Sequence, residues 1–297
     1  MDVAVVGGGA SGEAIRQALA VLGARARLLS RSTGFDVRRD DLHERVEGGG
    51  AIIEASGIFT TNQKTASQFF LASSRAVSAA ANRLGVPHVL LSIVNCESPQ
   101  VRGYGYFAAK AEQEDFARER SDRLILVRST QWFEFAEQNL ERLRFGPVAA
   151  VPSMRLQPVA LTPVAGVLAE CATDRREGNV HDLAGPEQMT LWQMTRSLKR
   201  RWPKPVPLIV PTSYGRAFRR GACIPGENAE IIGPRVQRLA PHSRVRGSGP
   251  RARRHWLRRR AARCSAARGS ELRLPHRGAP RRVPAHGHST RCGRQGR

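Results

Sequence analysis

Disulfide-forming cysteines and long apolar runs are both scarce in this chain of 297 residues. Its five cysteines are an odd number without the spacing of a disulfide framework, which is typical of proteins in a reducing compartment. No run approaches the roughly eighteen uncharged apolar residues that a membrane span needs. The glycine-rich start also lacks the basic and apolar regions of a signal peptide. We therefore expect a cytoplasmic protein with no membrane partner.

Acidic residues and lysine are almost absent from the C-terminal end of the chain. From Gly233 onward there are 19 Arg, no Lys and one acid, Glu271, so this segment carries a net charge of +18. The rest of the chain has 29 basic and 24 acidic residues, a net charge of only +5. The formal charge of +23 and the pI near 11.5 therefore describe the tail, and the body has the charge of an ordinary soluble enzyme.

The tail, residues 233–297, has the composition of a segment that cannot bury a core. It is rich in Arg, Ala, Gly, Pro, Ser and His and lacks Lys, Asp, Asn, Ile, Met, Phe and Tyr, so we expect disorder. One explanation is a basic arm that binds nucleic acid non-specifically through charge. The other, which we favour, is a frame-shifted terminus, because these residues are what G- and C-rich codons specify in a wrong frame.

Metal-binding patterns are missing as well. The tail holds four scattered candidate ligands, His276, His286, His288 and Cys292. Their spacing matches no established zinc pattern, and we expect no metal site. His88 and His181, in the body, are expected to be packing residues.

A glycine-rich turn follows the first apolar run of the chain. Gly7, Gly9 and Gly12 form a G-x-G-x-x-G pattern between that run and a helical stretch over 13–22, which is a dinucleotide-binding fingerprint. Gly7 permits the tight turn, Gly9 lets the backbone approach a pyrophosphate, and Gly12 lets the helix pack on the strand. We expect the pyrophosphate at the helix N-terminus, beside Ser11. A structural turn without a ligand is the alternative.

Short apolar runs alternate with helical patterns through the first half of the chain, as in βαβ units with a parallel sheet. The expected strands are 3–6, 26–30, 51–53, 89–94 and 124–127, and the expected helices are 13–22, 65–84 and 107–119. Because these strands are apolar on both faces, helices should cover both sides of the sheet. We predict an α/β fold, a Rossmann-type doubly wound parallel sheet, with residues 1–145 as the NAD(P)-binding domain.

The segment 146–232 is less regular and rich in proline. It contains a predicted helix near 164–172 and a capping box, Thr190 with Gln193, that begins another helix. Four prolines between 203 and 211 predict an extended strand or loop. We predict that 146–232 forms a small substrate-binding lobe that completes the same fold unit.

Tyr106 and Lys110 are four residues apart in a predicted helix, so their side chains share one face. A free phenol titrates near pH 10, and a nearby ammonium favours the phenolate. We expect Tyr106 to transfer a proton and Lys110 to lower the pKa of that phenol and to hold the cofactor ribose. The chain has only three Tyr and four Lys, which makes chance pairing uncommon. A surface tyrosine beside a helix lysine is the alternative.

Two serines follow apolar strands at the edge where ligands bind in α/β sheets. Ser92 could hydrogen-bond a substrate carbonyl or the tyrosine oxygen, although a polar residue that only ends a strand is an equal alternative. Ser56, after the strand 51–53, is expected at the cofactor.

Arg31 predicts which cofactor binds. NAD-binding proteins place an acid after the second strand to bind the ribose 2′-hydroxyl, whereas NADP-binding proteins offer an arginine. Here Arg31 and Ser32 follow the strand 26–30, and the next acid is Asp36. A guanidinium can bind a phosphate through two hydrogen bonds. We therefore expect NADP(H) to be preferred over NAD(H), with a solvated surface arginine as the alternative.

Together these motifs resemble the atypical short-chain dehydrogenase/reductases, and among them the NmrA-like NAD(P)-binding oxidoreductases. The resemblance covers about residues 1–233, and besides the glycine turn it is carried by 29–32, 91–94, Tyr106 with Lys110, 128–135 and 184–187. It implies a Rossmann domain, NADP(H) as the usual cofactor, and Ser–Tyr–Lys chemistry by Ser92, Tyr106 and Lys110.

The chain departs from the pattern of these relatives in three places. Its glycine turn is one residue shorter than the usual Gly-x-x-Gly-x-x-Gly of these relatives. The helix 65–84 has serines where catalytic relatives often have an Asn, with Asn82 only near its end. Pro163 stands where relatives often have an Asp ahead of a helix.

We therefore expect an NAD(P)H-dependent oxidoreductase that acts on a small carbonyl or alcohol substrate. A non-catalytic NADP(H)-sensing regulatory protein is the first alternative, and an epimerase that returns the hydride is the second. The Tyr106–Lys110 pair favours an enzyme, because a sensor does not need it, while the missing asparagine favours a sensor.

Overall fold

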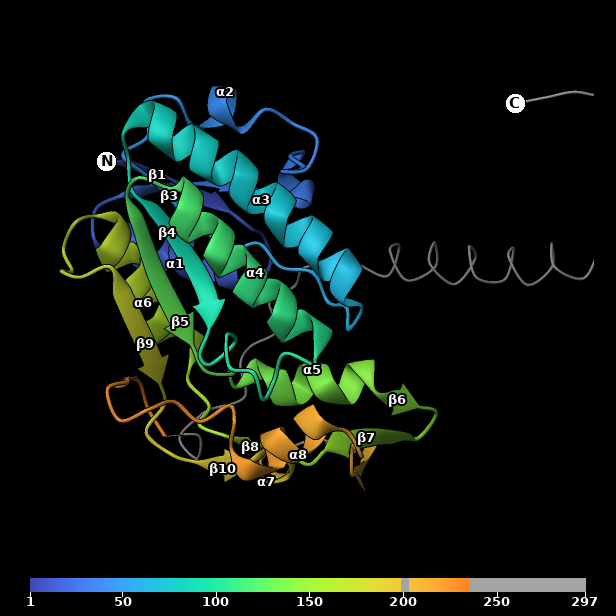
Figure 1. Cartoon of the computed structure of the whole chain (residues 1–297). Helices are drawn as coiled ribbons and strands as arrows, with labels where there is room; N and C mark the ends of the chain where they lie inside the picture. The colour runs from blue at the N-terminus through green and yellow to red at the C-terminus, as the bar shows by residue number, and fades with distance from the viewer. Residues whose placement is uncertain (199–202, 236–297) are drawn as a thin grey trace, which may run out of the picture. The chain divides into compact units, whose positions relative to one another are not determined.

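The computed structural model describes residues 1–198 and 203–235, which belong to one compact unit. At its centre is a sheet of seven strands, all parallel, in the order β12-β9-β5-β4-β3-β1-β2 (Figure 1). The strands are β1 (Asp2–Val6), β2 (Arg25–Leu29), β3 (Ala51–Glu54), β4 (His88–Ile93), β5 (Leu124–Ser129), β9 (Val180–Ala184) and β12 (Glu230–Ile231). The predicted doubly wound parallel sheet is confirmed. The tail from residue 236 lies outside the described residues.

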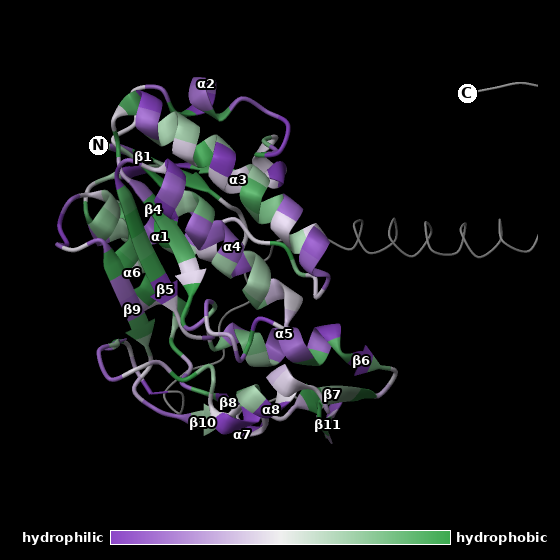
Figure 2. Ribbon diagram, in the orientation of Figure 1, coloured by the Kyte–Doolittle hydropathy of each residue, from purple (hydrophilic) through white to green (hydrophobic). Residues whose placement is uncertain are grey.

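Helices cover both faces of the sheet, as the apolar strands predicted (Figure 1). The helices α1 (Ala10–Val21) and α6 (Leu161–Ala172) cover one face, and α3 (Gln63–Leu84) and α4 (Gly105–Arg120) lie side by side on the other. Alternation along β1 explains this arrangement. Val3 and Val5 pack with α1 and α6, while Ala4 and Val6 pack with α3. The inner strands β4 and β5 are mainly hydrophobic in Figure 2.

Two predicted helices begin a few residues earlier in the structure than the sequence indicated, one of them with a side-chain cap. The predicted helix 65–84 begins two residues early, at Gln63, because the Asn62 side chain accepts a hydrogen bond from the Thr65 amide at 2.9 Å. The helix predicted near 164–172 begins at Leu161 without a side-chain cap. Pro163 fits there because N–H groups in a first helical turn have no partner within the helix.

The strand order places a topological switch point beside β1. From β1 the chain passes to β2 on one side of it. After β2 it runs through a short 3-10 helix (Arg31–Thr33) and α2 (Leu42–Val46) and enters β3 on the other side of β1. Ligands of open α/β sheets bind at the carboxyl ends of strands where the order reverses. The glycine turn follows β1 at this point.

The smaller lobe is not a continuous stretch of chain. It contains α5 (Glu134–Arg142), β6 (Arg144–Phe145), β7 (Val148–Pro152), β8 (Arg155–Leu156), β10 (Met189–Thr190), α7 (Leu191–Arg196), β11 (Lys204–Leu208) and α8 (Ser213–Arg220). The strands form a three-stranded sheet, β11-β7-β6, and a two-stranded sheet, β10-β8. Between these elements α6 and β9, and after them β12, belong to the main sheet and its covering helices, so the range 146–232 contributes to both parts.

Two sequence predictions for the lobe agree with the structure. The Thr190 hydroxyl accepts a hydrogen bond from the Gln193 amide at 3.1 Å, and the Gln193 side chain accepts one from the Thr190 amide at 2.8 Å, so the capping box begins α7. The proline-rich segment forms β11, which pairs in parallel with β7. None of the helices in the described ranges has the length and apolar character needed to cross a bilayer.

Candidate functional site

The three glycines of the turn have different surroundings. A Cβ on Gly7 would lie 2.5 Å from the Ala55 carbonyl oxygen, and a Cβ on Gly12 would lie 2.5 Å from the Gly7 carbonyl oxygen. Both positions exclude a side chain, which lets β1, β3 and α1 approach closely. Gly9 has φ +81° and ψ −153°, and a Cβ there would meet nothing within 4 Å. The turn is therefore closed toward the sheet and open at the N-terminus of α1.

A cavity of about 260 Å³ lies beside this turn, at the carboxyl ends of β1, β2 and β3. Five predicted cofactor residues line it, namely Gly7, Gly9, Arg31, Ser32 and Ser56. The lining does not include Ser11, Gly12 or Lys110. The sequence prediction of this cavity omitted Phe35 and Val37, from the segment after β2, and Phe69 of α3. Their distance from the glycine turn in sequence left no local signal.

The acid and the arginine in the cavity wall differ in their partners: Asp36 is paired with a cation, whereas Arg31 has no acidic partner among the described residues. Asp36 accepts hydrogen bonds from the Arg38 side chain at 2.7 and 3.0 Å and from the Arg38 amide at 3.1 Å. The Arg38 guanidinium, helped by that amide, holds the pKa of Asp36 well below its usual range. Arg31 is exposed and has no ion pair with an acid among the described residues. Arg31 is thus the cation available to a ligand in this cavity.

Tyr106 and Lys110 both contact the same buried ring, that of Phe70 on α3. The Tyr106 ring meets it edge-on, with centroids 5.5 Å apart, and the Lys110 Nζ lies 4.8 Å from its centroid. Burial raises the pKa of the Tyr106 phenol to about 12. This is the opposite direction to the shift that activates a tyrosine as a base, so the phenol is protonated at neutral pH.

Lys110 is 4% exposed, and its ammonium has two protein acceptors. Its Nζ donates to the Leu91 carbonyl oxygen at 2.8 Å and to Gln113 Oε1 at 2.6 Å. Burial lowers the pKa of Lys110, and the nearby Glu54, Cys96 and Glu114 oppose that shift. An ammonium has three N–H donors, so one donor is left for a ligand.

Gln113 connects Lys110 to a fully buried carboxylate, Glu54, at the end of β3. Gln113 Nε2 donates to Glu54 Oε1 at 2.9 Å, Ser74 donates to Oε2 at 2.8 Å, and His88 Nε2 lies 3.0 Å from Oε2. Burial alone would raise the pKa of Glu54, but hydrogen bonds from His88 and the serines hold it below its ordinary value. His88 is therefore packed in the interior, as predicted. Glu54 and Gln113 carry no signal in the sequence for these roles, because their contacts join distant segments.

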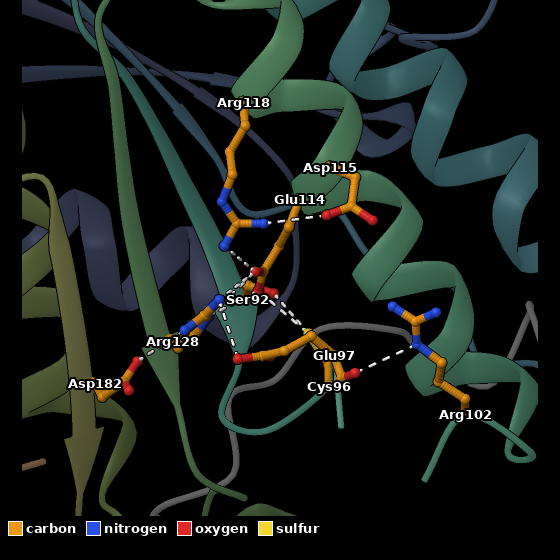
Figure 3. A network of polar contacts seen from close by, with 9 residues as sticks. All are labelled: Ser92, Cys96, Glu97, Arg102, Glu114, Asp115, Arg118, Arg128 and Asp182. Atoms are coloured by element: carbon orange, nitrogen blue, oxygen red, sulfur yellow. Dashed lines mark hydrogen bonds and ion pairs between the residues drawn. The ribbon is translucent and has the colours of Figure 1, made fainter. Parts of the chain in front are cut away.

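Ser92 lies in a second buried network, drawn in Figure 3. Its side chain is 2% exposed, and its Oγ is 3.8 Å from Cys96 Sγ, which donates to Glu114 at 3.2 Å. The Glu114 carboxylate is paired with Arg128 at 2.7 Å and Arg118 at 2.9 Å. These contacts are all within the protein, so the role of Ser92 at a substrate stays a prediction.

The same network contains Cys96, Glu97 and Glu114, whose ligand atoms lie within 4.8 Å of one another. Two guanidinium groups already neutralise Glu114, and burial raises the pKa of the Cys96 thiol far above its usual value. To bind a metal ion, this cluster would need a Cys96 thiolate and free carboxylate oxygens. This cluster is therefore better suited to hold α4 against the sheet than to bind a metal.

Arg142 acts on Tyr106 through its charge, and Asn82 is the asparagine of α3, the helix in which catalytic relatives often have a functional asparagine. Arg142 of α5 has its guanidinium carbon 3.8 Å from the Phe59 ring centroid, and its charge favours the Tyr106 phenolate against the larger effect of burial. Asn82 donates to the Arg120 carbonyl oxygen at 2.8 Å and accepts from the Asp122 amide at 3.0 Å. Asn82 thus joins α3 to the end of α4.

Comparisons with known proteins show the fold. No protein-family model matches the chain, and no curated protein matches it. Among solved structures, a dTDP-4-dehydrorhamnose reductase from Clostridium acetobutylicum has 14% identity and a TM-score of 0.54, over 76% of this chain and 94% of that one. A nucleoside-diphosphate-sugar epimerase from Staphylococcus aureus has 15% identity and a TM-score of 0.56, over 80% and 98%. The Bordetella bronchiseptica enzyme WbmH, in complex with NAD+, has 13% identity and a TM-score of 0.56, over 71% and 86%. The chain therefore shares the Rossmann-type fold of these proteins.

Proposed function

We propose that this chain binds a nicotinamide dinucleotide at the glycine turn and acts as an NAD(P)-dependent oxidoreductase of the short-chain dehydrogenase/reductase kind. The observation that carries the proposal is the contrast within the turn. Gly7 and Gly12 have no room for a Cβ, whereas Gly9 faces open space at the N-terminus of α1. Free amide groups and the helix dipole favour an anion there, so the residues present, with Ser11 in the first turn, fit a pyrophosphate.

Two features of the cavity support NADP(H) as the preferred cofactor. Arg31 is a cation without an acidic partner among the described residues, and the hydroxyls of Ser30 and Ser32 lie 2.8 Å apart beside it. Asp36, the acid that would otherwise bind a ribose 2′-hydroxyl, is already paired with Arg38. A 2′-phosphate would gain charge-assisted hydrogen bonds from Arg31, while Asp36 would not repel it strongly.

The bound nicotinamide would supply the hydride for reduction of a small carbonyl substrate. Burial raises the pKa of Tyr106 to about 12, so the phenolic oxygen holds its proton at neutral pH and would donate it to the carbonyl oxygen as the hydride arrives. Lys110 would bind the ribose through its remaining N–H. The charges of Lys110 and Arg142 would then stabilise the phenolate that is left, and Ser92 would orient the substrate oxygen only after leaving its present contacts.

Two alternatives use the same cofactor site. An epimerase would employ the same Tyr106 and Lys110 and return the hydride, and epimerases are among the solved structures with this fold. A sensor of the NmrA-like kind would need the glycine turn alone. The interior contacts of Ser92 and the structural role of Asn82 favour this second alternative.

The test is to assay the full chain with NADPH and NADH against aldehydes, ketones, quinones and 4-keto sugar nucleotides. We expect saturable NADPH binding, and NADPH consumption that Tyr106→Phe lowers by about 10²–10⁴-fold. Isomerisation of a sugar nucleotide without net consumption would indicate the epimerase. Binding without turnover of any substrate would indicate the sensor. Absence of saturable binding would contradict all three.

A further inference from the structure

The Lys110 ammonium is buried without a carboxylate among its hydrogen-bond acceptors in the described residues. Lys110 is almost fully buried, and both of its protein acceptors are neutral, the Leu91 carbonyl and the Gln113 amide. Burying an ammonium without a compensating charge is costly and favours its neutral form. A charged Lys110 therefore needs an anion close enough to act through the low-dielectric interior.

The Gln113 amide links Lys110 to such an anion, Glu54, and also donates to the Ser74 hydroxyl at 3.0 Å. Its Oε1 accepts from the Lys110 ammonium at 2.6 Å, and its Nε2 donates to the Glu54 carboxylate at 2.9 Å. A flipped amide would place two donors together at Lys110 and two acceptors together at Glu54. The amide dipole is thus aligned between cation and anion, an arrangement in which hydrogen bonds strengthen one another.

Glu54 is the suitable anion because its charge is not neutralised by an arginine or lysine. The His88 ring lies 3.0 Å from its carboxylate and carries a charge only when protonated, and its other contacts among the described residues are Gln113 and serine hydroxyls. The other acidic groups that face Lys110 are Glu114 and Cys96. Glu114 is paired with two arginines, and the Cys96 thiol stays protonated because burial raises its pKa.

We propose that Glu54 is a positioning residue which, through the Gln113 amide, keeps Lys110 charged and fixes the direction of its ammonium. The importance of this coupling for turnover rests on the proposed function, in which Lys110 binds the ribose and stabilises the Tyr106 phenolate. The coupling itself does not depend on any substrate. It joins the ends of β3 and β4 to α4, three elements that also position the proposed site.

The chain offers a direct measurement because it has only four lysines, Lys64, Lys110, Lys199 and Lys204. In full-length protein labelled with 13C at lysine Cε, four NMR signals can be followed against pH. Arginine substitutions at the other three positions assign the Lys110 signal by elimination. We expect the pKa of Lys110 to be lower by about one pH unit or more in Glu54→Gln than in the unchanged protein, the usual effect of one nearby charge.

The matched control is Glu112→Gln. Glu112 is a half-buried carboxylate two residues after Lys110 on α4 that accepts a hydrogen bond from Gln63 at 2.7 Å and makes none to Lys110 or Gln113 among the described residues, so its replacement should leave the Lys110 pKa unchanged. The double variant Glu54→Gln/Gln113→Glu moves the carboxylate into direct contact with Lys110. We expect its Lys110 pKa to return to the original value or above it, which a role limited to stability would not produce.

An unchanged Lys110 pKa in folded Glu54→Gln would overturn the proposal. If this single variant does not fold, the double variant decides: a Lys110 pKa at or above the original value supports the coupling, and a lower value contradicts it. NADPH titration of the same unchanged protein tests the proposed function separately. Absence of NADPH binding with a coupled Lys110 would remove the function and leave the charge coupling intact.

Discussion

Replacement of Gly9 by alanine tests the cofactor site at the one glycine of the turn that has room for a side chain. The methyl group would meet no protein atom within 4 Å, so it would project into the space assigned to the pyrophosphate. The backbone at Gly9, with φ +81° and ψ −153°, is one that residues other than glycine rarely adopt. The substitution should therefore weaken cofactor binding by obstruction and lower stability by backbone strain.

The two effects differ in size and can be measured separately. Strain of this kind costs about 1–3 kcal/mol, against a total stability of roughly 5–15 kcal/mol for a folded domain, so Gly9→Ala should still fold. Loss of one charge-assisted hydrogen bond to the pyrophosphate costs about 1.5–3 kcal/mol, which corresponds to roughly a 10- to 150-fold rise in the Kd of NADPH. Urea unfolding measures the first effect, and calorimetric titration with NADPH measures the second.

Gly23→Ala is the matched control at the other end of α1. Gly23 also has a positive φ, +74°, and a Cβ at this position would meet nothing within 4 Å, but it lies outside the cavity lining. It should lose stability through its positive φ and keep its NADPH affinity. If folded Gly9→Ala bound NADPH as tightly as Gly23→Ala, the assignment of the pyrophosphate to this turn would be refuted.

Three other predictions follow from the site. Arg31→Ala should weaken NADPH binding by about 1.5–3 kcal/mol and leave NADH binding and the control Arg39→Ala unchanged in calorimetry; equal NADPH and NADH affinities in the unchanged protein would remove the basis for this. Tyr106→Phe should lower turnover by about 10²–10⁴-fold with unchanged NADPH affinity, and full activity would place the acid elsewhere. The raised pKa of Tyr106, about 12, means that folding favours the protonated phenol. The resulting stability is present below the unfolded value near pH 10 and is lost as the pH rises to about 12. The stability of the unchanged protein against urea should therefore fall more steeply over that window than that of Tyr106→Phe, and parallel curves would contradict the burial of this phenol.

The parts of the fold that depend on local pattern were predictable from sequence. The apolar runs located β1 to β5 within a few residues, and the Thr190–Gln193 capping box located the start of α7. The lobe was harder because its strands pair across long separations. Lys204 of β11, for example, is in register with Val148 of β7, and no local property of either segment indicates that partner.

In the candidate site, too, the local motif was predictable from sequence and the long-range packing was not. The glycine turn is a local motif, and its steric consequences follow from the backbone around Gly7, Gly9 and Gly12. The surroundings of Tyr106 and Ser92 depend instead on what packs against them. Phe70 of α3 contributes to burying the phenol of Tyr106, and this burial reverses the direction of the expected pKa shift. Strand alternation places Ser92 on one face of the sheet, but only the structure shows Cys96 and Glu114 there.

A crystal structure of the full chain with saturating NADP+ tests the central claim most directly. The account predicts the pyrophosphate within hydrogen-bonding distance of the amide groups that follow Gly9, and the 2′-phosphate beside the Arg31 guanidinium. A cofactor bound away from the glycine turn, or no bound cofactor at saturating concentration, would contradict it.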